Sequence, residues 1–168
     1  MTKMEDLFDG IDKIPTSKFK TDLKFGESGE KWIIKFLKKY SEWVCIDSRS
    51  NESRSHSDLK YTKAGKIKYV EVKTDKYKDT GNIMVEFQCS GKDSGIRTTK
   101  SDMWINHFVL QKEVWIIKTE LLKDLVNLYG SDLYIGELSA IKGGDDNKSS
   151  MYVLKKECFK DHFKIIKY

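Results

Sequence analysis

The chain has 168 residues and a mass of 19.6 kDa, which fits one compact domain with a sizeable core and leaves little room for a second domain. Charged residues make up 34% of the sequence and hydrophobic residues 39%, so there is enough apolar material to exclude wholesale disorder. The net charge of +5 permits binding to a polyanion but does not require it.

Several classes of protein are excluded by what the sequence lacks. No stretch reaches the roughly 18 consecutive apolar residues of a membrane span, and the N-terminus has no apolar signal core. Cys45, Cys89 and Cys158 are too far apart for a C-x-x-C zinc motif, and three cysteines give no paired disulfide framework. We therefore expect a soluble, unsecreted protein with no membrane partner.

The N-terminal part of the chain predicts an arm followed by a helix. Residues 1–24 mix charges with few apolar repeats and include the only proline, so we interpret them as a loosely structured N-terminal arm before a single domain over residues 25–168. Apolar residues then recur at helical spacing, which predicts an amphipathic helix over about residues 28–40. Ser28 is its expected cap, and Glu30 lies in its first turn.

The rest of the chain predicts strands followed by further helices. We expect strands over 43–47, 57–61, 67–74, 83–89 and 113–118, a hairpin turn over 63–66, an irregular loop over 48–57, helices over 98–108 and 120–129, and an exposed turn over 143–148 before an apolar segment near 151–154. This order favours an α/β or α+β fold with a central mixed β-sheet flanked by helices.

One short window carries as much excess positive charge as the whole chain. Residues 60–78 contain seven lysines against Glu71 and Asp75, which leaves +5. Because clustered positive charge attracts phosphate groups, we expect this window, with Lys60 and Lys76 near its ends, to lie against DNA.

Two carboxylates and a lysine converge in the predicted hairpin. Side chains alternate along a strand, so Glu71 and Lys73 share one face while Val70 and Val72 share the other. The turn at residues 63–66 would bring Asp58 back toward Glu71. Two carboxylates with a backbone carbonyl nearby form the oxygen-rich ligand set that Mg²⁺ prefers, and Glu30, at the edge of the inward helix face, could complete the site.

Such a site suits phosphodiester hydrolysis. A bound divalent cation polarises the phosphate, makes bound water more acidic and stabilises charge in the transition state. Lys73 would orient or help to activate the attacking water and offset negative charge on the phosphate.

These motifs resemble those of a known group of nucleases. The helix opening Gly26-Glu27-Ser28-Gly29-Glu30, the pair Ser57-Asp58 and the strand Val70-Glu71-Val72-Lys73-Thr74 resemble the PD-(D/E)XK nuclease superfamily and, within it, archaeal Holliday-junction resolvases and their phage-encoded relatives. The resemblance covers about residues 26–108. It implies a restriction-endonuclease-like core, over about residues 26–118, with a C-terminal extension over 119–168. Ser57 stands where the superfamily pattern has proline, which leaves the local turn geometry open.

The resemblance implies a role for each matched residue. Asp58, Glu71 and the Val72 carbonyl would bind Mg²⁺, for which Mn²⁺ can substitute, Lys73 would be the catalytic lysine, and Glu30 would be the helix carboxylate, with Glu27 as the alternative. It also implies a homodimer that cleaves branched or duplex DNA in the cytoplasm, or in the host-cell cytoplasm if the chain is phage-encoded.

A second group of polar residues suggests contacts with the substrate. Thr98, Thr99 and Lys100 follow Arg97 at the start of the predicted helix over 98–108, where backbone amides could bind a phosphate. Gln88 and Glu86 share one face of the strand over 83–89, and a polar residue there is a further candidate for contact with substrate or metal. A capped loop and an exposed sheet face explain the same residues equally well.

Other functions remain open at this point. Glu71 and Lys73 could form an ordinary surface ion pair, and an acid at Glu30 is favoured in any first helical turn. The chain could also be a non-catalytic DNA-binding module that uses the lysine-rich hairpin. A restriction or repair nuclease is the third possibility, although only three arginines are available for bidentate contacts with bases.

Overall fold

The computed structural model describes residues 19–40, 44–47, 57–129, 138–143 and 148–168. In chain order the elements are α1 (Phe19–Tyr40), β1 (Val44–Asp47), β2 (Leu59–Lys63), β3 (Lys66–Asp75), β4 (Asn82–Cys89), β5 (Lys92–Asp93), η4 (Gly95–Arg97), β6 (Met103–Phe108), β7 (Glu113–Lys118), α2 (Thr119–Tyr129), β8 (Leu138–Gly143), β9 (Ser149–Lys155), α3 (Lys156–Phe159), η5 (Lys160–His162) and β10 (Lys164–Lys167).

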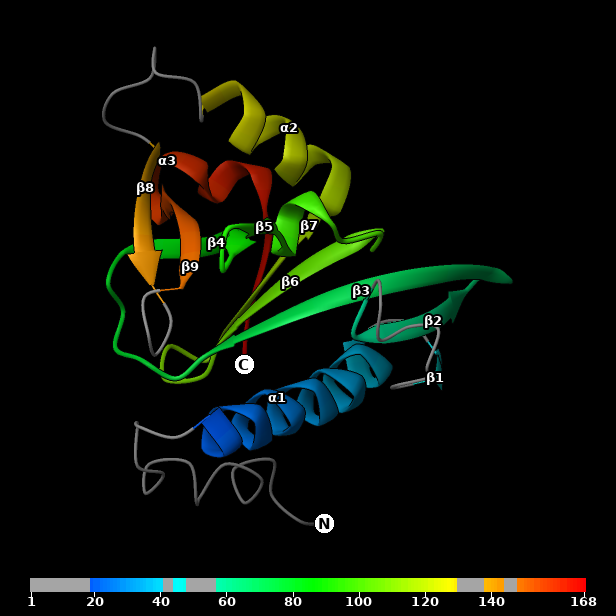
Figure 1. The fold of residues 1–168 in the computed structure, drawn as a ribbon. Helices are drawn as coiled ribbons and strands as arrows, with labels where there is room; N and C mark the ends of the chain where they lie inside the picture. Colours follow the sequence, from blue (N-terminus) through cyan, green and yellow to red (C-terminus); the bar gives the residue numbers. More distant parts are fainter. Residues whose placement is uncertain (1–18, 41–43, 48–56, 130–137, 144–147) are drawn as a thin grey trace.

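The strands among the described residues form two sheets. The larger has six strands in the order β1-β2-β3-β6-β7-β10, and the smaller has four in the order β5-β4-β9-β8. Within these residues only the β3–β6 pair is parallel, which makes the larger sheet mixed. Helix α1 lies on one side of this sheet, and α2 and the smaller sheet lie on the other (Figure 1). The predicted mixed sheet flanked by helices is thus confirmed as an α+β fold.

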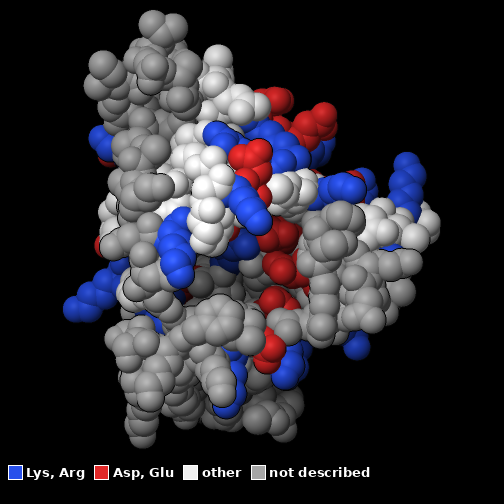
Figure 2. All heavy atoms as spheres, viewed as in Figure 1, with Lys and Arg blue, Asp and Glu red and all other residues white. Residues whose placement is uncertain are grey.

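The surface carries both signs of charge. In the view of Figure 1, acidic side chains gather near the middle of the molecule, with basic side chains beside them (Figure 2). None of the described helices is long and apolar enough to cross a membrane.

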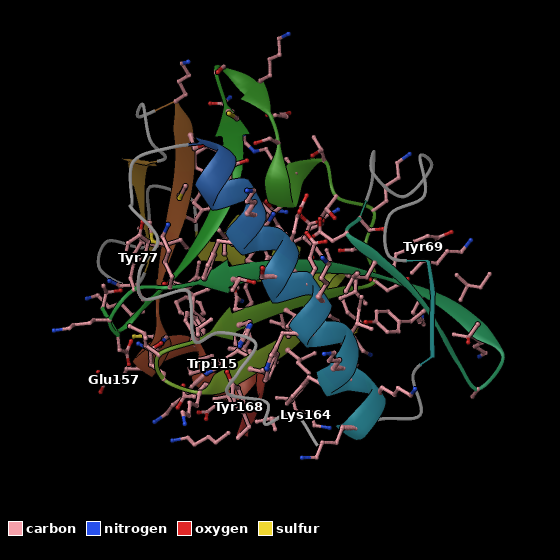
Figure 3. All side chains as sticks on the ribbon, turned by 90° about the horizontal axis from the view of Figure 1, so that it is seen from below. Tyr69, Tyr77, Trp115, Glu157, Lys164 and Tyr168 are labelled. Carbon is pink, nitrogen blue, oxygen red and sulfur yellow. The ribbon has the colours of Figure 1, made fainter. Side chains whose placement is uncertain are left out.

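Helix α1 begins earlier than its sequence pattern indicates. It starts at Phe19 rather than at residue 28, so residues 19–24 of the predicted arm are helical, while residues 1–18 lie outside the described part of the chain. Ser28 does not cap the helix: it lies inside it and donates a hydrogen bond from Oγ to the Lys24 carbonyl at 2.9 Å. The helix lies across the larger sheet (Figure 3).

A glycine sets how closely α1 approaches the sheet. Gly29 faces Thr74 of β3, and a Cβ at this position would overlap the Thr74 side chain. Glycine is unfavourable within a helix, by roughly 1 kcal/mol relative to alanine, but here it permits close contact between helix and strand. This contact keeps Glu30 near the strand that carries Glu71.

The predicted helix over residues 98–108 is wrong. The chain forms the short 3₁₀ turn η4 and then strand β6, whose residues from Trp104 to Phe108 are all buried. β6 is covered on both faces, so its sequence lacks the alternation of a half-exposed strand, and Asn106 and His107 are buried together with its apolar residues. Its length and composition alone did not distinguish it from a buried helix.

The hairpin and most other predicted elements are confirmed. β2 and β3 pair in antiparallel fashion from Leu59 opposite Val70 to Lys63 opposite Lys66. Ala64 and Gly65 make the turn at φ of 48° and 72°, which is typical of a two-residue hairpin turn. The strands over 83–89 and 113–118 and the helix over 120–129 correspond to β4, β7 and α2. Trp43, the loop over 48–56, Gly130 and residues 144–147 lie outside the described residues.

Two apolar cores lie on opposite sides of the larger sheet. One fills the space between α1 and the sheet and contains Trp32, Phe36, Val70 and Val72. The other fills the space between the larger sheet, α2 and the smaller sheet, and it contains Trp104 and Trp115 among others. The described tryptophans are therefore core residues.

Candidate active site

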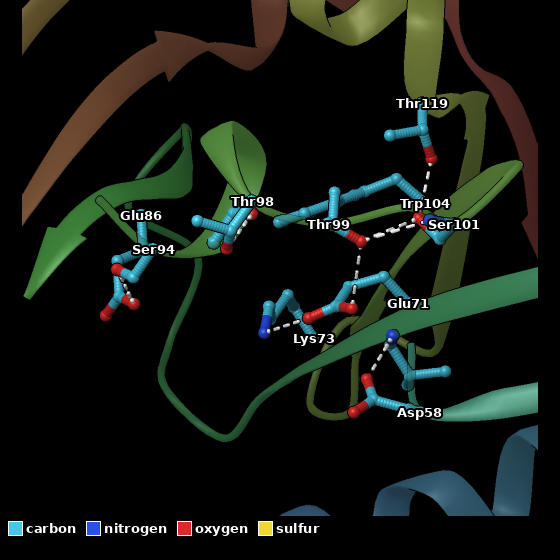
Figure 4. A network of polar contacts seen from close by, with 12 residues as sticks. Asp58, Glu71, Lys73, Glu86, Ser94, Thr98, Thr99, Ser101, Trp104 and Thr119 are labelled. Atoms are coloured by element: carbon cyan, nitrogen blue, oxygen red, sulfur yellow. Dashed lines mark hydrogen bonds and ion pairs between the residues drawn. The ribbon is translucent and has the colours of Figure 1, made fainter. Parts of the chain in front are cut away.

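The hairpin brings Asp58 beside Glu71. The Val72 N–H donates to Asp58 Oδ2 at 2.7 Å, and the Asp58 N–H donates to the Val70 carbonyl at 3.1 Å. The N–H and carbonyl of one strand residue point to the same side, so the Val72 carbonyl also points toward Asp58, beyond the end of β2. Glu71 is 9% exposed on β3. The sequence-predicted convergence of the two carboxylates is therefore present (Figure 4).

Glu71 is held through both of its oxygens. Lys73 Nζ donates to Glu71 Oε1 at 2.7 Å, and the Thr99 hydroxyl donates to Glu71 Oε2 at 3.3 Å. Lys73 Nζ also lies 5.4 Å from the centroid of the Trp104 ring, on the same face of the sheet. The ion pair is therefore partly enclosed by the protein, which distinguishes it from a solvated pair on an open strand.

A chain of buried hydroxyl groups connects Glu71 to the start of α2. Thr99 Oγ1 lies 3.1 Å from Ser101 Oγ, which lies 2.8 Å from Thr119 Oγ1 at the start of α2. Lys123 Nζ donates to the Thr99 carbonyl at 2.9 Å. Thr99 is 5% exposed, and its hydroxyl bonds to Glu71 and Ser101 within the protein, so this side chain positions Glu71. Its predicted contact with DNA stays a prediction.

The carboxylates crowd one another electrostatically. Burial raises the pKa of Asp58 to about 6, with Glu71 and more weakly Glu30 acting in the same direction, although Lys73 and the Val72 N–H oppose the shift. Glu30, half-buried on α1, is thus close enough to act on Asp58, as the predicted helix carboxylate should be. Negative charge at this point is unfavourable until a cation offsets it.

Lys73 remains an ammonium at neutral pH. Burial lowers the pKa of Lys73, but Glu71 and Asp58 outweigh that effect and raise it above its ordinary value, and Glu86 adds to the increase. A protonated lysine cannot accept a proton from water. Lys73 can therefore donate hydrogen bonds and offset negative charge, but it cannot activate water by taking up its proton.

These residues fit a magnesium site with few protein ligands. No group of three Cys, His, Asp or Glu side chains within the described ranges is gathered as a ready metal-binding cluster. Mg²⁺ commonly binds one or two carboxylates and completes its shell with water and substrate phosphate. Asp58, Glu71 and the Val72 carbonyl, which points to the same strand edge as the N–H bonded to Asp58, provide such a set. A bound cation would relieve the repulsion between the two carboxylates.

The smaller sheet contributes a further carboxylate, Glu86, to the surroundings of the site. Glu86 of β4 accepts hydrogen bonds from the hydroxyls of Ser94 and Ser149, each at 2.7 Å. Gly95, at φ 52°, lies against the Glu86 backbone, where a Cβ would overlap the carbonyl. Glu86 is thus fixed in place on the Lys73 side of the site. The sequence signal was weak, because the hydroxyl partners come from distant segments.

The other predicted DNA contacts lie at the surface around this site. Arg97 is exposed, pairs with Asp93 at 2.9 Å, and stacks 4.6 Å from the centroid of the Phe87 ring. Thr98 and Lys100 are also exposed, but no helix begins at them, so the predicted phosphate site at a helix N-terminus is wrong. The remaining three are half-buried: Lys60 on β2, Lys76 after β3, and Gln88 on β4.

Comparison with models of known protein families and with curated proteins finds no match to this chain. The likeness to the PD-(D/E)XK nucleases therefore remains a resemblance of motifs. The interpretation of the site depends on the residues themselves and on how the fold arranges them.

Proposed function

We propose that the protein is a metal-dependent nuclease. More particularly, we propose a Mg²⁺-dependent DNA endonuclease that hydrolyses phosphodiester bonds. The observation that supports this most strongly is the placement of Asp58, Glu71 and Lys73 within hydrogen-bonding and electrostatic contact of one another, beside Glu30 of α1. An ordinary ion pair does not need a second buried carboxylate whose charge is unfavourable there.

Each residue has a distinct task in this proposal. Asp58, Glu71 and the Val72 carbonyl would hold the ion, and Thr99 keeps the Glu71 carboxylate in place. When bound, Mg²⁺ polarises the phosphate and makes a coordinated water more acidic. Lys73 donates from its ammonium to the phosphate, where it offsets the negative charge that develops as the bond breaks. Glu30, whose charge acts on Asp58 from α1, would accept a hydrogen bond from the attacking water.

The motif resemblance is the basis for a more specific proposal about the DNA substrate and the oligomeric state. Branched DNA, such as a four-way junction formed in DNA recombination, is the favoured substrate. A homodimer suits this substrate because two sites are needed to cut two strands of a junction together.

A panel of substrates tests the function. The purified chain is incubated with four-way junction, linear duplex and single-stranded DNA, each with Mg²⁺, Mn²⁺ or EDTA. We expect cleavage with either metal, fastest on the junction, and none in EDTA. Metal-independent binding without cleavage of any substrate would instead support a non-catalytic DNA-binding module.

A further inference from the structure

On the β3 edge, the tip of the β2–β3 hairpin extends beyond strand β6, while on the other edge β1 pairs with β2 as far as Thr62. Strand β6 pairs with β3 only from Met103 opposite Val70 onward, and Asp102 extends this contact by one residue to Tyr69. The β3 residues before Tyr69, from Lys66 to Lys68, therefore have no β6 partner on that edge. Figure 1 shows this end of β3 extending away from the smaller sheet.

The projecting tip is fully paired and basic. Two residues at positive φ close it tightly, and every residue of β2 pairs with β3. The segment from Leu59 to Val70 contains four lysines and no acidic residue. Lys66 is exposed, and Ile67 beside it is 51% exposed. Lys68 forms an ion pair with Asp102 at 3.3 Å, which fixes it at the base of the tip.

The face of the hairpin that continues from Glu71 leads toward this tip. Tyr69 and Ile67 share the Glu71 face by strand alternation, and Lys60, paired with Tyr69, shares it too. In the opposite direction the smaller sheet lies beside the site, since Glu86 acts on Lys73. By the same alternation Lys66 lies on the opposite face, where it is exposed beside the turn. Of the described β3 residues on the Glu71 face, Tyr69 is half-buried and Ile67 is 51% exposed, so a long substrate held at Glu71 would follow this face toward the tip.

The carboxylates themselves cannot supply affinity for a phosphate backbone. Asp58 and Glu71 bring two carboxylates together here, and Lys73 is already paired with Glu71. Positive charge for substrate binding has to come from neighbouring surface, and the hairpin tip is a basic element along β3 from the site.

We propose that the hairpin tip is a duplex-binding arm that contacts DNA phosphates on one side of the cleaved bond. The choice of DNA as partner rests on the proposed function. At about 3.3 Å per residue, Ile67 and Lys66 lie about 13–17 Å along β3 from Glu71. Phosphates of one DNA strand recur every ~3.4 Å along the helix axis. The arm therefore meets the duplex about four or five base pairs from the scissile phosphate.

Lysines on an exposed strand edge have another known use, which is to prevent edge-to-edge association. The two roles give different results. Edge protection predicts that removal of lysines causes self-association without weakening DNA binding, whereas a duplex-binding arm predicts weaker binding by a protein that stays monodisperse or keeps its wild-type assembly.

The test compares two double variants of equal charge. Lys60→Ala/Lys66→Ala changes the arm, and Lys160→Ala/Lys164→Ala changes exposed lysines in η5 and β10, the latter at the opposite edge of the larger sheet. Figure 3 shows Lys164 well apart from Tyr69 of the hairpin. Binding to a 30-base-pair duplex is measured by fluorescence anisotropy in EDTA over a range of NaCl concentrations, with thermal unfolding as a check on folding.

We expect the arm variant to bind about tenfold more weakly at low salt and to lose about two from the slope of log K against log [NaCl], since each phosphate contact contributes ~0.9. The control variant should match the wild type. Equal affinities and slopes for the two variants, or self-association of the arm variant with unchanged DNA binding, would overturn the proposal.

Cleavage separates this inference from the proposed function. Duplexes trimmed to two base pairs on one side of the cut should be cleaved poorly by wild type, and duplexes with six base pairs there should be cleaved normally. If wild type cleaves both equally, the arm proposal fails while the nuclease function stands. If it cleaves nothing but the salt slopes differ as expected, the arm stands and the nuclease function fails.

Discussion

At the scale of single residues, the site holds its two carboxylates in place by hydrogen bonds, although their negative charges are unfavourable there. Glu71 has hydrogen bonds to both oxygens, and Asp58 accepts a backbone N–H at 2.7 Å. The pKa of Asp58 is nevertheless raised to about 6, mainly by burial and by Glu71. Because the pKa of Asp58 is higher in the folded protein than its ordinary value of 3.8, ionisation of Asp58 lowers stability as the pH rises from about 4 to 6, and the full cost remains above pH 6. Functional sites often lower the stability of the folded protein in this way.

Replacing Asp58 with asparagine should therefore stabilise the metal-free protein. The asparagine side chain would retain an oxygen for the Val72 N–H but carry no charge. At pH 8 in EDTA we expect the Asp58→Asn variant to melt above wild type, by roughly 2–4 °C for each kcal/mol regained. Addition of Mg²⁺ should raise the melting temperature of wild type and leave that of the variant unchanged. A variant that melts lower in EDTA and still gains stability from Mg²⁺ would contradict the assignment.

At the scale of elements, local patterns predicted the hairpin and not its neighbour β6. Asp58, Glu71 and Lys73 lie within one hairpin, so strand alternation and a tight turn were enough to bring them together. Thr99 and Glu86 reach the site through the parallel β3–β6 pair and through the smaller sheet. Pairing between distant segments leaves little trace in local sequence, which is why their roles could not be predicted.

Helix α1 and strand β6 meet around a buried histidine that should make stability depend on pH. His107 stacks on Trp32, with ring centroids 4.2 Å apart, and its Nε2 lies 2.8 Å from the Tyr168 hydroxyl. Burial lowers the pKa of His107 to about 3, from its ordinary value of 6.5. The unfolded chain therefore binds the proton more readily than the folded protein between these two values.

The stability that neutral His107 contributes is complete above about pH 6.5 and is lost as the pH falls toward 3. The limiting slope is about 1.4 kcal/mol per pH unit. Urea unfolding at pH 7, 5.5 and 4.5 should show that the advantage of wild type over His107→Phe in free energy of unfolding shrinks as the pH falls. The opposite change that Asp58 contributes between about pH 4 and 6 is common to both proteins and cancels in this difference. Parallel profiles for the two proteins would mean that His107 does not titrate in this way.

At the scale of the whole molecule, the two sheets and α1 each supply part of one site. The larger sheet carries Asp58, Glu71 and Lys73, α1 carries Glu30, and the smaller sheet carries Glu86. The predicted fold class and the central residues of the site could be obtained from sequence, because they depend on composition and on one hairpin. The two-sheet arrangement could not, since it depends on how β4 and β9 pair across a long intervening stretch of chain.

The central claim is that Asp58, Glu71 and Lys73 form a nuclease site, and single-turnover cleavage by matched lysine variants tests it most directly. Lys73→Ala removes the ammonium at the site, and Lys78→Ala removes an exposed lysine five residues further on. With Mg²⁺ and the best substrate of the panel, we predict that Lys73→Ala binds DNA and loses cleavage by at least about 100-fold, while Lys78→Ala cleaves like wild type. Equal cleavage by Lys73→Ala and wild type would contradict the account.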